Sequence, residues 1–168
     1  MRNPFLIDVG EELRHPGVRR TLALTAPLPG VALSTTRVPD DVDVVADLVL
    51  EAQGATIIVQ GTVWAPWVGE CRRCLGPTRG ELTAEVHEVF EPNPTEGETF
   101  PLVGEQVDLA PMLRETLALA LPLAPLCTED CAGPDPEDHP VLVPDDATDD
   151  ARPTDPRWAA LDELRFDA

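Results

Sequence analysis

Four cysteines stand in two close pairs, in a chain that contains no lysine and a large excess of acidic residues. Two residues separate Cys71 from Cys74, and three separate Cys127 from Cys131. Two thiols at such a spacing can hold one side of a tetrahedral ion, and a second pair completes a Cys₄ shell. The sequence therefore predicts a structural zinc site that joins the middle of the chain to its C-terminal third.

Two other interpretations of the cysteines stay open, namely four unliganded thiols and a redox pair. A thioredoxin-like pair needs a strand that leads into a helix, whereas the residues after Cys74 resemble a strand. Arg72 and Arg73 would favour a thiolate in either case, so they do not discriminate. A zinc-dependent or redox enzyme is the competing class of function. A shell of four thiolates leaves no open position for a substrate, and the sequence has no phosphate loop, nucleophile elbow or His-Glu-x-x-His motif. We therefore expect no enzymatic activity.

Arginine and tryptophan side chains near the first pair suggest contact with RNA. Arg72, Arg73 and Arg79 could bind phosphate, and Trp64 and Trp67 could stack on unpaired bases. In the alternative interpretation the arginines are solvated and the tryptophans pack on the sheet.

Charge divides the chain into two unlike halves. Residues 1–80 hold 8 arginines and 9 acidic residues, whereas residues 81–168 hold 4 arginines and 22 acidic residues, which gives the net charge of −19. The acidic half would repel phosphate within a Debye length of about 8 Å, so RNA would meet the near-neutral half. A basic protein would meet the acidic half. No secretory signal or long apolar run is present, so we expect a cytoplasmic protein.

The elements that must position these residues follow from periodicity. Alternating apolar residues predict strands, and a spacing of three and four residues predicts a helix over 109–121, with Asp108 as its N-cap and Pro122 as its end. The fold class is therefore α+β, an antiparallel sheet of about five or six strands with one covering helix and the first cysteine pair at a strand-to-strand tip. The expected strands lie at 5–9, 19–26, 42–50, 55–64 and 79–90.

Composition predicts three parts along the chain. Residues 1–131 form a single domain. Residues 132–156 hold six prolines and eight acidic residues, a composition that cannot offset its ordering entropy and predicts a disordered linker. Residues 157–168 predict a short terminal helix, because Trp158 and Leu161 share one helical face.

Several stretches together resemble the actinobacterial form of the YceD family, the large ribosomal RNA subunit accumulation proteins. The order and spacing of these stretches match over nearly the whole chain. They are Arg-Asn-Pro-Phe at 2–5, Gly-Glu-Cys-Arg-Arg-Cys-Leu at 69–75, Pro-Leu-Val-Gly-Glu-Gln-Val-Asp-Leu-Ala-Pro-Met-Leu-Arg-Glu at 101–115, Leu-Ala-Leu-Pro-Leu-Ala-Pro-Leu-Cys at 119–127 and Asp-Pro-Arg-Trp-Ala-Ala-Leu at 155–161.

The resemblance implies a non-enzymatic ribosome biogenesis factor that supports accumulation of large-subunit ribosomal RNA, with ribosomal RNA or a basic large-subunit protein as its partner. Many relatives continue with a third cysteine pair, where this chain has Asp135, Asp138 and His139. If the family's metal used that pair, these side chains would have to replace thiols, at lower affinity for a thiophilic ion. We expect the four retained cysteines to suffice, because they already fill a tetrahedron.

Overall fold

The computed structural model describes residues 3–135, 137 and 138 of the chain. The chain divides into two units, Met1–Pro134 and Asp135–Ala168, and the first unit contains all the elements below. Most of the predicted linker 132–156 and all of the predicted terminal helix 157–168 lie outside the described residues. No helix among the described residues is long and apolar enough to cross a membrane.

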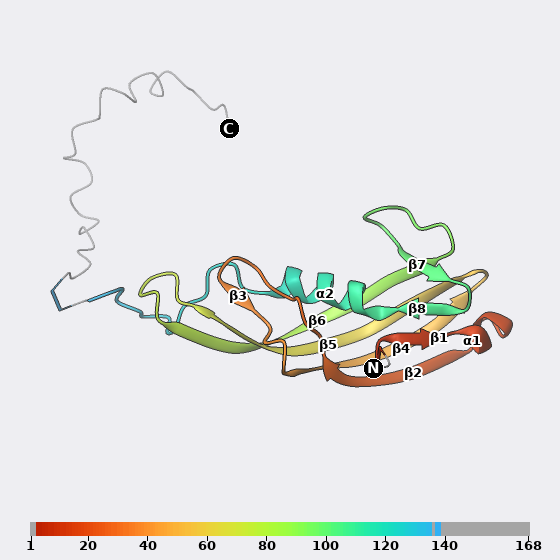
Figure 1. Ribbon diagram of the computed structural model, residues 1–168, viewed down its shortest axis with the longest axis horizontal. Coiled ribbons are helices and arrows are strands. Elements are labelled where there is room, and N and C mark those ends of the chain that lie inside the picture. The colour runs from red at the N-terminus through yellow and green to blue at the C-terminus, as the bar shows by residue number, and fades with distance from the viewer. Residues whose placement is uncertain (1–2, 136, 139–168) are drawn as a thin grey trace, which may run out of the picture. The chain divides into compact units, whose positions relative to one another are not determined.

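The first unit is built on one curved sheet of eight strands (Figure 1). The strand order is β1-β8-β7-β6-β5-β4-β2, and β3 pairs with β5 off this path. Every pairing is antiparallel except that of β6 with β7. The strands are β1 (Leu6–Asp8), β2 (Arg19–Pro27), β3 (Thr36–Arg37), β4 (Asp43–Gln53), β5 (Thr56–Glu70), β6 (Pro77–Glu91), β7 (Phe100–Val103) and β8 (Gln106–Asp108).

The prediction of five or six antiparallel strands was wrong in number and in direction. The sheet is larger and mixed because β7 and β8 extend it beyond β6 and carry β1 at its edge. With four and three residues, these strands are too short to show the alternation that identifies a strand in a sequence. The balance of elements is also more strongly β than the predicted α+β class.

Alternation along the long central strands separates two faces of the sheet. Every second residue is buried along β4, and four residues at odd positions are buried on β5, as Leu48, Leu50, Val59, Val63 and Ala65 illustrate. Because successive side chains on a strand point to opposite faces, these residues define an inner face that packs into the core. The residues between them define an outer face that helix α2 does not cover.

Helix α2 (Leu109–Ala120) lies along the inner face, over β6 and against β5 and β1 (Figure 1). Its N-cap is Asp108, whose carboxylate accepts a hydrogen bond from the amide of Ala110 at 3.0 Å. Each large apolar side chain buried this way contributes about 1.5–3 kcal/mol. The predicted helix at 109–121 and its cap are thereby confirmed. Its buried residues are Leu109, Ala110, Met112, Leu113 and Leu117.

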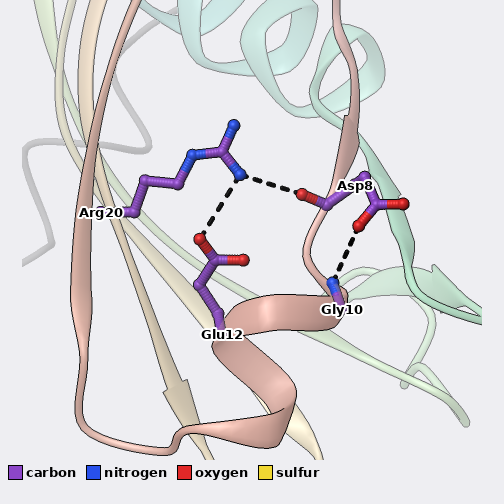
Figure 2. Close-up of polar contacts among 4 residues, drawn as sticks. All are labelled: Asp8, Gly10, Glu12 and Arg20. Carbon is purple, nitrogen blue, oxygen red and sulfur yellow. Dashed lines mark hydrogen bonds and ion pairs between the residues drawn. The ribbon is translucent and has the colours of Figure 1, made fainter.

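A short helix, α1 (Gly10–Arg14), lies between β1 and β2. Figure 2 shows how Arg20 of β2 reaches across to it. The guanidinium donates to the carbonyl of Asp8 at 3.0 Å and to the carboxylate of Glu12 at 3.4 Å. The Glu12 side chain is only 5% exposed. Arg20 therefore supplies the positive charge that a buried carboxylate needs.

Candidate metal centre

The first cysteine pair lies in a tight knuckle, residues 71–76, between β5 and β6. The amide of Cys71 donates to the carbonyl of Gly76 at 2.8 Å, and the amide of Leu75 donates back to the carbonyl of Cys71 at 2.9 Å. Leu75 has a φ of 60°, an uncommon left-handed conformation for such a side chain. Such a residue persists only where its surroundings hold it in place, so the knuckle is a fixed loop.

The second pair belongs to the segment that follows α2, residues 121–131. Two threonine hydroxyls bind this segment: Thr36 of β3 donates to the carbonyl of Pro122 at 3.1 Å, and Thr78 of β6 donates to that of Leu126 at 3.3 Å. Thr36 and Thr78 both pair in register with Gly69 of β5. Directly paired residues share a face of the sheet, so the segment crosses the inner face over this row.

Further hydrogen bonds join the knuckle to the same segment. The amide of Arg72 donates to the carbonyl of Pro125 at 2.9 Å. The guanidinium of Arg73 donates to the carbonyls of Cys131 at 2.9 Å and Glu129 at 3.4 Å. Arg73 therefore holds the loop that carries the second cysteine pair.

The four sulfur atoms converge, as the spacing of the cysteines predicts. All four Sγ atoms lie within 4.8 Å of one another. Cys71 and Cys131 are 3.7 Å apart at sulfur, and Cys74 and Cys127 are 3.8 Å apart. A disulfide requires about 2.05 Å, and all four thiols are free. We refer to the knuckle, residues 121–131 and their four thiols as the cysteine clip.

The residues fit a tetrahedral zinc ion. Four sulfurs bound to zinc at about 2.3 Å form a tetrahedron whose edges are about 3.8 Å, and the two measured sulfur–sulfur distances match that edge. Asp135 and Asp138 belong to the second unit, and His139 lies outside the described residues, so the expectation about these three side chains stays a prediction. The four cysteines are therefore the donors that could hold zinc, with no position left for a substrate.

Ionisation of the thiols is uneven. The backbone amide of Cys74 hydrogen-bonds the Cys71 sulfur and, together with other amides, lowers the pKa of Cys71 to about 6. The neighbouring Cys131 side chain raises the pKa of Cys127 to about 11, and Cys74 and burial add to that rise. The Cys71 thiolate is thus stabilised by local amides, while the Cys127 thiolate is disfavoured in the absence of a cation. A bound dication would remove that conflict, because a coordinated thiol is deprotonated.

Sequence comparisons place this architecture in a family. The family model described as "Large ribosomal RNA subunit accumulation protein YceD" matches residues 59–165, which include both cysteine pairs and α2. The chain belongs to the YceD family. Uncharacterized proteins of Mycobacterium tuberculosis and Mycobacterium bovis are each 31% identical to it over 170 residues, which cover 96% of this chain and 82% of each relative. An uncharacterized protein of Mycobacterium leprae is 28% identical, with coverage of 96% and 78%. No solved structure matches the chain.

The five residues predicted for RNA contact in this YceD-family chain are not gathered on one surface. Trp64 and Arg79 face outward, since they alternate with inward-facing neighbours on β5 and β6. Trp67 faces inward, packs against the core, and covers Gly80, where an added Cβ would lie 2.8 Å from its ring. Of the two knuckle arginines, Arg72 has an exposed side chain, while Arg73 binds the carbonyls of the clip.

Sequence reasoning missed two residues that position the site, and a third that lies beside them. Thr36 and Thr78 bind the segment after α2, and Arg37 lies next to Thr36 on the two-residue strand β3. These residues are placed by strand register with β5, and no local sequence motif predicts that register.

Proposed function

We propose that this protein is a non-enzymatic factor of ribosome biogenesis that acts in the cytoplasm and supports accumulation of large-subunit ribosomal RNA. Membership of the YceD family, whose model carries that description, is the observation on which the proposal depends. The protein would act by binding, with ribosomal RNA as the partner. A basic large-subunit ribosomal protein, held by the acidic half of the chain, is the competing partner.

A structural zinc ion in the cysteine clip belongs to the same proposal. The mutual distances of the four sulfurs support it. When bound, zinc would supply a cross-link between the tip of the β5–β6 hairpin and the segment after α2. The residues of the clip would hold the ion and fix these two segments, and would take no part in a reaction.

Affinity capture of the full chain from a cell extract, with and without ribonuclease, tests the partner. Direct RNA binding predicts enrichment of large-subunit ribosomal RNA that ribonuclease removes and high salt weakens. Capture of a basic ribosomal protein that survives ribonuclease would favour the competing partner. Recovery of neither would contradict the proposed binding role.

Depletion of the protein in cells tests the function itself. The proposal predicts a lower ratio of large-subunit to small-subunit ribosomal RNA, restored by the wild-type gene. Thiol titration separates the redox alternative, because a zinc-bound clip holds four slowly reacting thiols. A Cys71 thiol that reacts quickly in the zinc-loaded protein, together with an unchanged RNA ratio after depletion, would support redox chemistry instead.

A further inference from the structure

An open pocket of about 870 Å³ lies beside the cysteine clip, between residues 33–37 and the ends of β5 and β6. Its lining comes only from residues 33–37, 68–70, 75 and 77–79. All of these belong to the near-neutral half of the chain, and the acidic half contributes none. The lining includes the outward-facing row Arg37, Val68 and Arg79 and the inward-facing row Thr36, Gly69 and Thr78, and the segment 121–131 contributes nothing to it.

Two arginines lie at matching positions on either side of the pocket floor. Arg37 of β3 pairs in register with Val68 of β5, which pairs in register with Arg79 of β6. The three side chains therefore share the outer face. Strands lie about 4.8 Å apart, so the backbones of the two arginines are about 10 Å apart. Across that distance, the long side chains of the two arginines can bring both guanidinium groups to one phosphate, or each can bind one of two successive phosphates.

Neither guanidinium is neutralised by a carboxylate in the described part of the chain. The ion pairs there join Arg14 to Glu105, Arg19 to Glu51 and Arg20 to Glu12. Arg37 and Arg79 are exposed and take part in none of them.

The rest of the lining is chemically mixed in a way that suits a nucleotide. Val68, Leu75 and Pro77 form an apolar part, and Leu75 is 71% exposed. Ser34 and Thr35 add hydroxyl groups to the lining. An apolar surface can take the face of a ribose or base, while hydroxyls and guanidinium groups bind phosphate oxygens.

We propose that this pocket binds a short segment of single-stranded RNA, with its phosphates on Arg37 and Arg79 and a nucleoside against Val68, Leu75 and Pro77. The inference rests on the proposed RNA-binding function and names the surface that carries it. One carboxylate, Glu70, also lines the pocket and opposes a phosphate there. Glu81, two residues beyond Arg79 on β6, faces the same side but lies outside the lining.

The test measures fluorescence anisotropy of a labelled twelve-nucleotide oligouridylate with the full-length protein. The double variant Arg37→Gln/Arg79→Gln should bind at least about tenfold more weakly. Losing two phosphate contacts should reduce the slope of log affinity against log salt by about 1.4. The control Arg14→Gln/Arg19→Gln removes the same charge from outside the pocket and should change affinity by less than about twofold. Glu70→Gln should tighten binding, since it removes the opposing charge.

A second measurement does not depend on variants. Oligouridylate that contains 4-thiouridine should cross-link, on irradiation of the wild-type protein, to peptides that contain residues 33–37 or 75–79. Equal loss of affinity in the two double variants, or cross-links confined to other peptides, would overturn the pocket. Binding of polyglutamate as tight as that of RNA would overturn its assignment to nucleic acid.

The outcomes separate this inference from the proposed function. If wild-type protein binds RNA and the pocket variant binds it equally well, the pocket is wrong and RNA binding stands. If wild-type protein binds no RNA, both the pocket and the RNA partner are wrong. The cellular ratio of ribosomal RNAs then still decides whether the protein acts in biogenesis.

Discussion

The zinc ion proposed for the cysteine clip predicts that chelation loosens one end of the sheet and leaves the rest folded. Zinc binding accounts for most of the folding free energy of isolated zinc-finger peptides, about 10–16 kcal/mol, because nothing else holds them together. Here most of the buried hydrophobic core, Leu48 and Leu117 among it, comes from residues outside the clip. Chelation should therefore destabilise the protein without unfolding it.

The size of the effect follows from the loop that the metal closes. Cys74 and Cys127 are 53 residues apart. In the loop-closure model, cross-linking a loop of that length removes unfolded-state entropy worth about 4 kcal/mol at 25 °C. At about 2–4 °C per kcal/mol for a chain of this size, the melting temperature should fall by about 8–16 °C. Hydrogen bonds from Thr36 and Thr78 to the segment remain and limit the loss.

Native mass spectrometry and denaturant titration provide the measurement. The purified chain should carry one zinc ion, and chelation should lower the free energy of unfolding, with recovery on adding zinc. Cys127→Ser should reproduce the loss, and chelator should then add little. Hydrogen exchange should speed up at the amide of Arg72, which donates to Pro125, and stay slow in β4. A chain that holds no metal, or whose stability chelation leaves unchanged, would refute the reasoning.

Three further predictions concern the scaffold. Arg20→Ala should lower the free energy of unfolding in urea by about 1–3 kcal/mol, because it leaves the buried carboxylate of Glu12 without its cation. The double variant Arg20→Ala/Glu12→Gln should recover much of that loss. Costs of the two single substitutions that simply add in the double variant would argue against the pairing. Burial and the charge of Glu115 raise the pKa of Glu88, so its ionised form costs stability as pH rises through that pKa. Glu88→Gln should therefore raise the melting temperature at pH 7 but not at pH 3. The control Glu85→Gln, on the outer face, should leave the melting temperature unchanged at both pH values. Gly61→Ala should destabilise the protein by more than about 2 kcal/mol, because a Cβ there would meet the carbonyl of Asp47 and φ is 149°. The control Gly54→Ala, with open space around it, should cost only about 1 kcal/mol. Equal costs would contradict the close approach of Gly61 to the backbone of Asp47.

Local patterns in the sequence were enough to find the long elements. The expected strand at 19–26 corresponds to β2, and that at 79–90 corresponds to β6. The helix begins at the residue after its predicted cap. Each of these is long enough for alternation or helical spacing to repeat several times. Periodicity therefore predicts where the long strands and the helix lie, and tertiary contacts determine only the residues at which they end.

The short strands depend on contacts that local patterns do not encode. β3 has two residues, and it pairs with β5 far along the chain. β7 follows a polar loop and pairs with β6 in parallel, an arrangement that needs a neighbouring strand already in place. β6 is that neighbour, and the sequence of the loop before β7 does not indicate the pairing.

The opposite placement of the two tryptophans shows how one boundary changes a site prediction. The expected strand ended at Trp64, whereas β5 continues to Glu70. On a continuous strand, residues 64 and 67 must face opposite sides, because side chains alternate. Trp64 therefore lies on the outer face and Trp67 on the inner face, while the predicted contact of either with RNA stays a prediction. Cysteine spacing was a safer guide, since it predicted convergence of the thiols without requiring any strand boundary.

Strand register links the cysteine clip to the pocket that Arg37 and Arg79 line. The row Thr36–Gly69–Thr78 holds the segment after α2 on the inner face. The next row, Arg37–Val68–Arg79, faces outward and carries the two arginines. Gly69 permits this arrangement, because an added Cβ would lie 2.6 Å from the carbonyl of Thr35. β3 has only two residues and depends on such contacts for its position. A metal that fixes the clip would thus also fix the spacing of the arginines, so a structural ion can serve a binding function without touching the ligand.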